Sequence, residues 1–381
     1  VHVNQVSPVH DSRLSSRLWH RWMKQGATAV ALTQCLSVRG SIESAPTDDQ
    51  RGADVIAYLS KRIAVWALLV FVATNLTYFL ANAMLDPRSN YAARRPPLPE
   101  AQVDATLSGY NLNDKVPILE RWWTWLSGIL FHWDWGRTPL GLSVNEQISF
   151  RMMSSVQLLA AATILSTLLG IAVGVYTALR QYKLSDRAWQ LVSLASINLP
   201  VPVLGLGIVL LGISVNQALG NTVVYVSGSE SLGISGFWAV AGDRAQHLIL
   251  PTLTLVIGGY AGLHLLQRSL LLDTINSDYV RTARAKGLTR GQAVRKHALR
   301  TAIIPVAVGI AFAIPAVFTG AVLTETIFAW EGMGRYFVSS INTSDINGVV
   351  AVAAFGAAAT AVGAILADIV VVYLDPRVRV S

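Results

Sequence analysis

Six stretches of the chain carry apolar runs long enough to cross a lipid bilayer, and this pattern constrains the fold more than any other feature. A spanning helix needs about 20 mostly apolar residues. The predicted ranges are 63–85, 152–179, 191–215, 247–272, 301–324 and 346–374. Six buried helices of a large soluble protein are the alternative, but such helices rarely combine this length with so little charge. We therefore predict an all-α, polytopic membrane protein with six transmembrane helices.

The composition agrees with this class and excludes others. Of the 381 residues, 52% are hydrophobic and 14% are charged, whereas a soluble domain carries about 25% charged residues. The single cysteine, Cys35, excludes a disulfide within the chain and any multi-cysteine metal site. The net charge of +8 is expected at one membrane face, so it does not require a nucleic-acid partner.

The distribution of basic residues predicts the orientation. Six spans place both termini on one side, and that side would receive 21 of the 30 Lys and Arg residues. Because these residues favour the cytoplasmic face, both termini are predicted to be cytoplasmic, in a multi-pass protein of the inner or plasma membrane. No apolar stretch follows the N-terminus closely, so residues 1–55 do not resemble a signal peptide. We expect a cytoplasmic extension over 1–55 and a transmembrane domain over 56–381.

The extension contains one pattern with a physical meaning. Arg13, Arg17, Arg21 and Lys24 recur at helical spacing, with Leu, Trp and Met residues beside them. This arrangement is typical of a helix lying on anionic lipid; disorder or a wrongly assigned start codon is the alternative. Residues 41–55 are polar and are predicted to form a linker.

Residues 86–151, between the first two spans, are the one large segment predicted outside the membrane. The aromatic cluster in it comprises Trp122, Trp123, Trp125, Phe131, Trp133 and Trp135. Tryptophan favours the membrane–water boundary, so we expect a small folded cap with helices resting on the bilayer. Packing of the tryptophans within the cap explains the cluster equally well.

Patterns of the common catalytic sites do not occur in the sequence. None of the six lysines follows a glycine, so the chain has no Walker-type phosphate-binding loop. The seven histidines lack metal-ligand spacing, and His264 is expected to be a packed core residue. The metalloprotease and serine-hydrolase motifs are absent as well. We therefore predict no catalytic residue and no metal ligand.

Some polar and kink-forming residues near the predicted spans are candidates for a transport pathway. Proline removes a helix hydrogen bond, and kinked helices suit a cavity that changes shape, although kinks also occur as packing features. Glu325 and Asp368 are acidic residues in or beside the spans, and an ion pair or a helix cap is the favoured role for both. The pathway candidates are Asn198, Pro200, Pro305, Thr319, Thr324 and Glu325.

The loop over 273–300, between the fourth and fifth spans, is strongly basic. Ser277 is a suitable N-cap, a short helix is predicted over 279–286, and Gly287 is placed to end it. Thr289 and Gln292 have the spacing of a capping box for a second helix. A short basic helix beside a glycine hinge is a suitable docking surface for a partner protein, although an ordinary positive-inside loop would have the same composition.

Several motifs in this order resemble one transporter family. The run from Asp278 to Leu288 closely resembles the coupling loop of ABC-importer permeases of the oligopeptide/dipeptide family. Residues 58–63, 134–140, 325–335 and 374–379 resemble further segments of that family in the same order. The resemblance covers about residues 57–380, and the large cap with six spans is similar to the B-type permease.

The resemblance implies a type I ABC-importer permease that forms the translocation pathway with a second, C-type permease by alternating access. Two ABC ATPase subunits would consume ATP with Mg²⁺, and an extracytoplasmic substrate-binding protein would deliver cargo, while this chain would bind no cofactor. Oligopeptides or dipeptides are the expected cargo; nickel, a haem precursor or glutathione, or a stand-alone secondary transporter, are alternatives. The residues implied to couple to the ATPase are Asp278, Tyr279, Arg281, Thr282, Ala283, Arg284, Ala285, Lys286 and Gly287.

Three features depart from the family pattern. Glu331 stands where the family usually has proline, which leaves that turn less rigid. The glutamate of the older importer motif is missing, because Arg281, Thr282 and Ala283 fill its place. Docking would then rely on arginine, backbone and alanine packing. Residues 1–55 have no counterpart in the family.

Overall fold

The computed structural model describes residues 48–92, 95–96, 98–306, 309 and 321–374. The basic pattern at 13–24, Thr319, most of the predicted fifth span and the motif after Leu374 lie outside the described residues. The chain divides into a unit over residues 1–59 and a unit over residues 60–379. Of the first unit, the structure describes only the start of helix α3, from Asp48.

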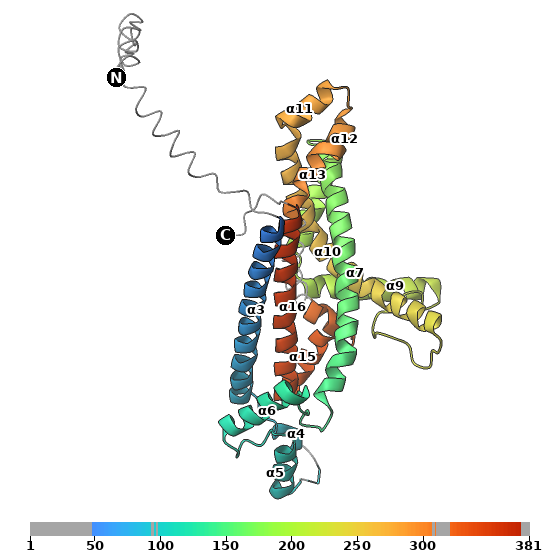
Figure 1. The fold of residues 1–381 in the computed structure, drawn as a ribbon. Coiled ribbons are helices and arrows are strands. Elements are labelled where there is room, and N and C mark those ends of the chain that lie inside the picture. The colour runs from blue at the N-terminus through green and yellow to red at the C-terminus, as the bar shows by residue number, and fades with distance from the viewer. Residues whose placement is uncertain (1–47, 93–94, 97, 307–308, 310–320, 375–381) are drawn as a thin grey trace, which may run out of the picture. The chain divides into compact units, whose positions relative to one another are not determined.

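The described residues form helices with connecting segments, and the β-structure among them is an isolated bridge between Arg137 and Ser143. Figure 1 shows the arrangement. The helices are α3 (Asp48–Met84), α4 (Ser89–Ala92), α5 (Glu100–Gly109), α6 (Ile118–His132), α7 (Val144–Leu179), α8 (Leu184–Asn198), α9 (Val201–Leu219), α10 (Phe237–Ile275), α11 (Asp278–Ala285), α12 (Arg290–Ala293), the π-helix η1 (Val294–Ala298), α13 (Leu299–Ala302), α15 (Met333–Asn342) and α16 (Ile346–Leu374).

Within the described residues, five helical stretches are long and apolar enough to cross a membrane. They are Ser60–Ala92, Val144–Leu179, Val201–Leu219, Phe237–Ile275 and Ile346–Leu366. The all-α, membrane-spanning class predicted from the sequence is confirmed. Four predicted ranges, 63–85, 152–179, 247–272 and 346–374, fall on α3, α7, α10 and α16, with the first running to Leu85, one residue past the end of α3.

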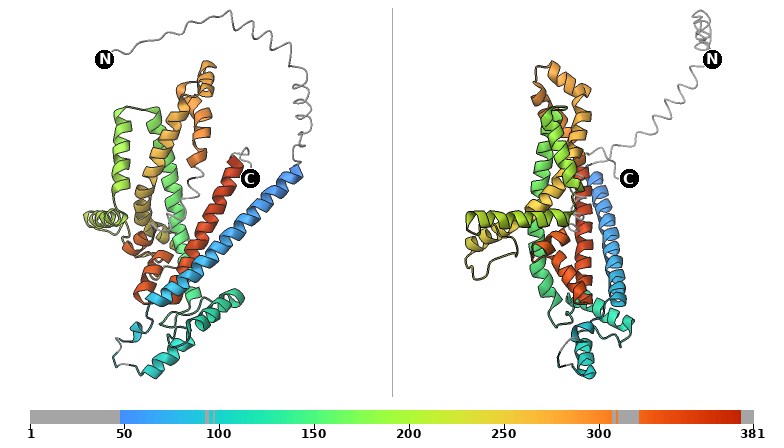
Figure 2. Two further views of the ribbon diagram at one scale, coloured as in Figure 1. Left: turned by 90° about the vertical axis from the view of Figure 1, so that its left-hand side faces the viewer. Right: turned by 180° about the vertical axis from the view of Figure 1, so that it is seen from behind.

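The predicted third span, 191–215, is not one continuous helix. α8 ends at Asn198 and α9 begins at Val201, with extended backbone at Leu199 and Pro200. Proline has no N–H to donate and disfavours the helical conformation of the residue before it, which accounts for the break. α9 leaves α8 in a different direction (Figure 2). Pro251, by contrast, lies inside α10, which continues past it.

α7 and α10 pack side by side at two glycines (Figure 1). A Cβ atom added at Gly170 would lie 2.6 Å from Cβ of Leu263, and one added at Gly174 would lie 2.8 Å from Cβ of Gln267. Small residues allow helix backbones to approach each other closely. The crossing therefore has no room for a larger side chain.

A separate hydrophobic core joins the segment after α3 to the ends of two long helices. Leu107 of α5 and Trp125 of α6 are buried with Tyr78 of α3 and Val350 of α16. The rings of Tyr78 and Trp125 are stacked with their centroids 4.6 Å apart. Other aromatic side chains of this segment are exposed: Trp123, Phe131 and Trp133. The tryptophan cluster thus both packs internally and presents aromatic surface.

Candidate functional site

The helix predicted over 279–286 is present as α11, over Asp278–Ala285. Ser277 precedes it in an extended conformation, but its hydroxyl donates to the carbonyl of Thr274 rather than capping α11. Gly287 follows with a φ of +94°, a conformation that favours glycine, so the chain turns there. The predicted capping box of Thr289 and Gln292 is formed at the start of α12.

One side of α11 anchors it to the long helices. Val280 and Ala283 are buried in a core with Ala178 of α7 and Leu271 of α10. The same core continues through α12, η1 and α13, with Val294 among its buried residues. Spacing of three residues places Val280 and Ala283 on the same helix face. This apolar face fixes α11 across the ends of α7 and α10.

The opposite side of α11 is exposed and carries three basic residues and one acidic residue. The exposed candidates are Asp278, Tyr279, Arg281, Thr282, Arg284, Ala285, Lys286 and Gly287. Ala283 is the exception, because it belongs to the buried face. Arg281 lies 3.8 Å from Asp278, and both side chains are largely exposed, so this ion pair leaves the arginine available to a partner.

A cavity of about 310 Å³ lies between α11 and α12. Ile275, Val280 and Val294 form its apolar part, and Asn276 with two arginines forms its polar part. The arginines, Arg284 and Arg290, come from α11 and α12. Two guanidinium groups at one cavity suit carboxylates or backbone carbonyls as incoming groups.

A buried ion pair supports the region behind α11. Arg268 of α10 donates to both carboxylate oxygens of Asp186, at 2.8 and 2.9 Å. The backbone N–H of Tyr182 and the amide of Gln190 donate to the same carboxylate. The hydrogen bond from Arg268 holds the pKa of Asp186 below its usual range. α8 and α10 are therefore fixed to each other near the end that carries α11.

His264 links three helices in the same region. Its ring nitrogens lie 2.6 Å from Oγ of Ser193 in α8 and 3.0 Å from Oγ1 of Thr177 in α7. The side chain is fully buried in α10. This is the packed core histidine predicted from the sequence, with both ring nitrogens satisfied by hydroxyl groups.

Glu325 caps a helix and is buried. Its carboxylate accepts hydrogen bonds from Oγ of Ser155 at 2.6 Å and from the backbone N–H groups of Gly334 and Arg335 at 2.7 and 3.1 Å. These N–H groups belong to the first turn of α15, where a carboxylate is favourable. A Cβ atom added at Gly332 would lie 2.4 Å from the carboxylate. The cap favoured from the sequence is thus present.

Asp368, the second acidic residue in or beside the predicted spans, forms the ion pair favoured from the sequence. Asp368 of α16 accepts a hydrogen bond from Nε of Arg62 in α3, at 2.7 Å. Glu331, which replaces the family's usual proline, pairs with Arg335 and lies 3.4 Å from Arg151. Ion pairs thus hold a second pair of helices and the turn before α15.

The pathway candidates do not form one polar cluster within the described part of the chain. Asn198 is exposed, and its amide donates to the carbonyl of Leu194 in its own helix. Pro200 and Pro305 are exposed, whereas Thr324 is buried beside Glu325. Thr319 lies outside the described residues. The structure therefore gives these residues separate positions, and Glu325 a structural contact.

Sequence reasoning missed several residues that hold this region together. Ser155 accepts a hydrogen bond from the N–H of Met333 while it donates to Glu325. Its partners are more than 160 residues away in the chain, so no local pattern marks it. Asp186 carried a weak signal, because it is an acidic residue in an otherwise basic connection.

Comparison with known proteins places this architecture among transport components. Residues 166–380 match the family model described as "binding-protein-dependent transport system inner membrane component". The chain is 39% identical over 325 residues to the oligopeptide transport system permease protein OppB of Mycobacterium tuberculosis (strain ATCC 25618 / H37Rv). That alignment covers 85% of this chain and 99% of the relative.

Two proteins of Bacillus subtilis (strain 168) show the same similarity at lower identity. The oligopeptide transport system permease protein AppB is 32% identical over 334 residues, with 85% of this chain and 99% of the relative covered. The dipeptide transport system permease protein DppB is 29% identical over 325 residues, with 84% and 97% covered. The similarity thus extends over nearly the full length of each relative.

Proposed function

Because the chain belongs to the family of binding-protein-dependent transport system inner membrane components, we propose that it is the permease subunit of an ATP-driven importer for oligopeptides or dipeptides. The peptide cargo is proposed from the names of relatives such as OppB, AppB and DppB. A second permease of the C type completes the translocation pathway. The subunit itself performs no covalent chemistry.

The observation that carries the coupling part of this proposal is the two-sided structure of α11. Val280 and Ala283 fix the helix to α7 and α10, while the basic side is exposed. A partner that binds the exposed side of α11 can displace the helix, and the buried side transmits this displacement to α7 and α10. The sequence contains no Walker-type phosphate-binding loop, which supports separate ATPase subunits, consuming ATP with Mg²⁺, as the source of the driving force.

The chemistry of the α11 surface indicates how an ATPase docks. Arg284 and Arg290 line the cavity beside the helix, and Arg281 and Lys286 are exposed next to it. A complementary groove on the ATPase would present carboxylates or free carbonyls to these side chains. Both termini and α11 lie on the cytoplasmic side in this proposal, which the excess of basic residues in these segments supports.

The segment over 86–151 serves as the outside surface for an extracytoplasmic binding protein. It has its own buried core around Leu107 and Trp125, so it can present a fixed surface. ATP binding in the paired ATPases would displace α11, and the long helices would then open the pathway alternately to each side. Nickel, a haem precursor or glutathione remain alternative cargoes within the same mechanism.

A pull-down from mild detergent tests the coupling proposal. The tagged full chain is compared with Arg281→Glu/Arg284→Glu, and co-purifying subunits are identified by mass while vanadate-sensitive ATPase activity is measured. We expect wild type to retain an ATPase and the double variant to lose it, because two basic docking groups become acidic. Gly287→Pro should weaken retention as well, because it alters the end of α11.

Lys183→Glu/Arg187→Glu is the matched control, because both residues are exposed and basic but lie away from α11, just before α8 and in its first turn. It should retain the ATPase. Absence of any ATPase from wild type would contradict the importer proposal and favour a stand-alone secondary transporter. Equal loss in both double variants would show that overall charge, rather than the α11 surface, governs retention.

A further inference from the structure

The cap, here residues 86–143 before α7, is fastened to the turn between α15 and α16. The side-chain amide of Asn90 in α4 donates a hydrogen bond to the carbonyl of Thr343, at 2.7 Å. Beside it, Oγ of Ser89 lies 3.4 Å from Oγ of Ser344. The partners are 253 and 255 residues apart in the chain. These two contacts therefore join parts of the protein that are remote in sequence.

A second connection joins the end of the cap to the first turn of α16. Asn347 is buried, and its side-chain amide donates to the carbonyl of Arg137 at 2.8 Å. A Cβ atom added at Gly136 would lie 2.7 Å from the amide nitrogen of Asn347. The backbone of the cap therefore lies directly against this side chain, with no space for a larger residue between them.

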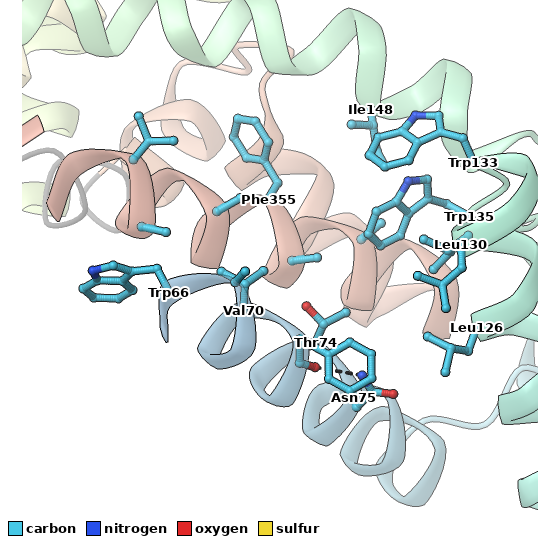
Figure 3. Close-up of a pocket in the computed structure, with 18 of the residues that line it drawn as sticks. Trp66, Val70, Thr74, Asn75, Leu126, Leu130, Trp133, Trp135, Ile148 and Phe355 are labelled. Atoms are coloured by element: carbon cyan, nitrogen blue, oxygen red, sulfur yellow. Dashed lines mark hydrogen bonds between the residues drawn. The ribbon is translucent and has the colours of Figure 1, made fainter. Parts of the chain in front are cut away.

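Apolar packing supports these hydrogen bonds. Ile346 and Val350 of α16 are buried in one core with Leu107 and Trp125 of the cap. Trp135 of the cap also lines the groove of about 730 Å³ between α3 and α16 (Figure 3). Close-packed side chains resist relative movement. The cap and the start of α16 are therefore held together by packing as well as by hydrogen bonds.

The turn between the two helices is itself tightly held. Ser344 has a φ of +48°, which a residue other than glycine seldom adopts. Its N–H donates to the carbonyl of Ile341 at 3.1 Å, and the N–H of Asp345 donates to the carbonyl of Ser340 at 2.7 Å. The carboxylate of Asp345 accepts from the N–H of Gly348. Such a conformation persists where the surrounding contacts fix it, so the turn is a stiff link.

α15 continues this connection from the turn to α7. The first turn of α15 donates the N–H groups of Gly334 and Arg335 to the carboxylate of Glu325. The same carboxylate accepts from Oγ of Ser155 in α7. α15 has 10 residues, so it spans about 15 Å at 1.5 Å per residue. An unbroken series of contacts therefore runs from the cap through the turn and α15 to α7.

We propose that the cap, the turn and α15 form one rigid unit that transmits a displacement of the cap to α7, with Asn90 and Asn347 as positioning residues. The functional consequence rests on the proposed function, because the binding protein that docks on the cap belongs to that proposal. Docking moves the cap and α15 together, and Glu325 passes this movement to Ser155 of α7. Asn90 and Asn347 act by fixing the cap to the turn and to α16, without contacting cargo.

A disulfide between the cap and the turn tests whether they move as one unit. Ser89→Cys/Ser344→Cys replaces the two hydroxyls that lie 3.4 Å apart, in a chain whose single natural cysteine is removed by Cys35→Ser. The complex with its co-purifying ATPase is oxidised with copper phenanthroline, either without nucleotide or trapped with ATP and vanadate. We expect equal cross-linking in both states and unchanged ATPase activity of the locked complex. Cross-linking in only one state, or loss of activity on locking, would overturn the proposal.

Removal of both amides tests the positioning residues. In Asn90→Ala/Asn347→Ala, the rate of the same cross-link should fall about fivefold, the equilibrium effect of one hydrogen bond. Uptake of radiolabelled trialanine by cells should fall, while the ATPase is still retained in the pull-down. Asn216→Ala is the matched control, because this amide also donates to a backbone carbonyl, that of Val224 at 2.7 Å, but joins α9 to the segment after it. It should leave the cross-linking rate and the uptake unchanged.

Rescue by the disulfide separates positioning from folding. With the cysteine pair added to Asn90→Ala/Asn347→Ala, uptake should return on oxidation and disappear on reduction, because the disulfide replaces the lost fastening. Unchanged uptake in the double alanine variant, or no recovery on oxidation, would contradict the proposal. If the double variant does not insert, Asn90→Ala alone decides by the same rates. A wild type that does not take up trialanine would contradict the proposed peptide cargo, and the cross-linking comparisons would then decide this inference alone.

Discussion

Buried carboxylates hold the start of two neighbouring helices, Glu325 for α15 and Asp345 for α16. Asp345 accepts from the N–H of Gly348 at 3.0 Å and from the hydroxyl of Tyr336 at 3.3 Å. Burial raises the pKa of Asp345 to about 6, despite these hydrogen bonds. The removal of the carboxylate from water therefore destabilises its charged form by more than these two hydrogen bonds stabilise it.

The raised pKa of Asp345 predicts a pH dependence of stability. The folded chain binds this proton more tightly than the unfolded chain, whose carboxyl has the ordinary pKa of 3.8. The contribution is thus fully present below pH 3.8 and is lost as pH rises through about 6. Asp345→Asn imitates the protonated carboxyl but cannot ionise, so it should remove this pH dependence, which amounts to up to about 3 kcal/mol.

Thermal unfolding in detergent at pH 5 and pH 7.5 measures the effect. The fall in midpoint temperature between these values should be smaller for Asp345→Asn than for wild type. Asp114→Asn is the control, because Arg88 lowers the pKa of Asp114 instead, so its removal should leave the fall unchanged. An identical pH response of wild type and Asp345→Asn would contradict the prediction.

At the scale of elements, the end of α11 depends on backbone conformation at Gly287. Its φ of +94° disfavours any side chain, although a Cβ there would meet nothing within 4 Å. Gly287→Ala should therefore cost about 1–2 kcal/mol locally through conformation alone. Gly291 in α12 also faces open space but has no such restriction, so Gly291→Ala should be neutral or slightly stabilising.

Hydrogen–deuterium exchange of the peptide covering 278–288 is the measurement for this pair. Gly287→Ala should raise the exchange rate of α11 about five- to thirtyfold, as expected for a local loss of 1–2 kcal/mol. Gly291→Ala should leave that rate at the wild-type value. Unchanged exchange in Gly287→Ala would mean that the buried side of α11, rather than the turn, sets its stability.

Local elements were predictable from the sequence where their determinants lie within one turn. The stop at Gly287 and the capping box of Thr289 and Gln292 involve neighbours in the chain, so pattern was sufficient. The break at Pro200 was harder, because Pro251 lies in a similar apolar run and leaves α10 continuous. Whether a proline ends a helix depends on tertiary packing that restores the lost hydrogen bond or does not.

Long-range contacts were not predictable in the same way. The single sequence marks Glu325 as an unusual acid, and a cap was the favoured role. It does not reveal that Ser155, 170 residues earlier, completes the cap. Likewise, Gly170 and Gly174 look like ordinary small residues until the position of α10 is known. Docking residues were assigned by resemblance, and the structure adds that Ala283 is on the buried side.

At the scale of the whole molecule, the close packing of α7 and α10 predicts sensitivity to very small substitutions. Gly174→Ala places a Cβ 2.8 Å from Gln267 and 3.1 Å from the carbonyl oxygen of His264. The helices would have to separate, at a cost of about 1–3 kcal/mol. Gly262→Ala in α10 meets nothing within 4 Å and should keep or raise stability.

Midpoint temperatures of the purified variants, together with cargo uptake by cells, measure this difference. Gly174→Ala should lower both, whereas Gly262→Ala should lower neither. If Gly174→Ala unfolds like wild type, the two helices have more freedom to separate than their contacts indicate.

The close contact between α7 and α10 also limits how the two helices can move. Helices that touch at Gly170 and Gly174 cannot slide past each other without collision, so they tilt together. From Pro251 to the end of α10 at Ile275, the helix segment is about 36 Å long at 1.5 Å per residue. α11 follows directly after the end of this segment, so a sideways displacement of α11 would tilt α7 and α10 as one unit.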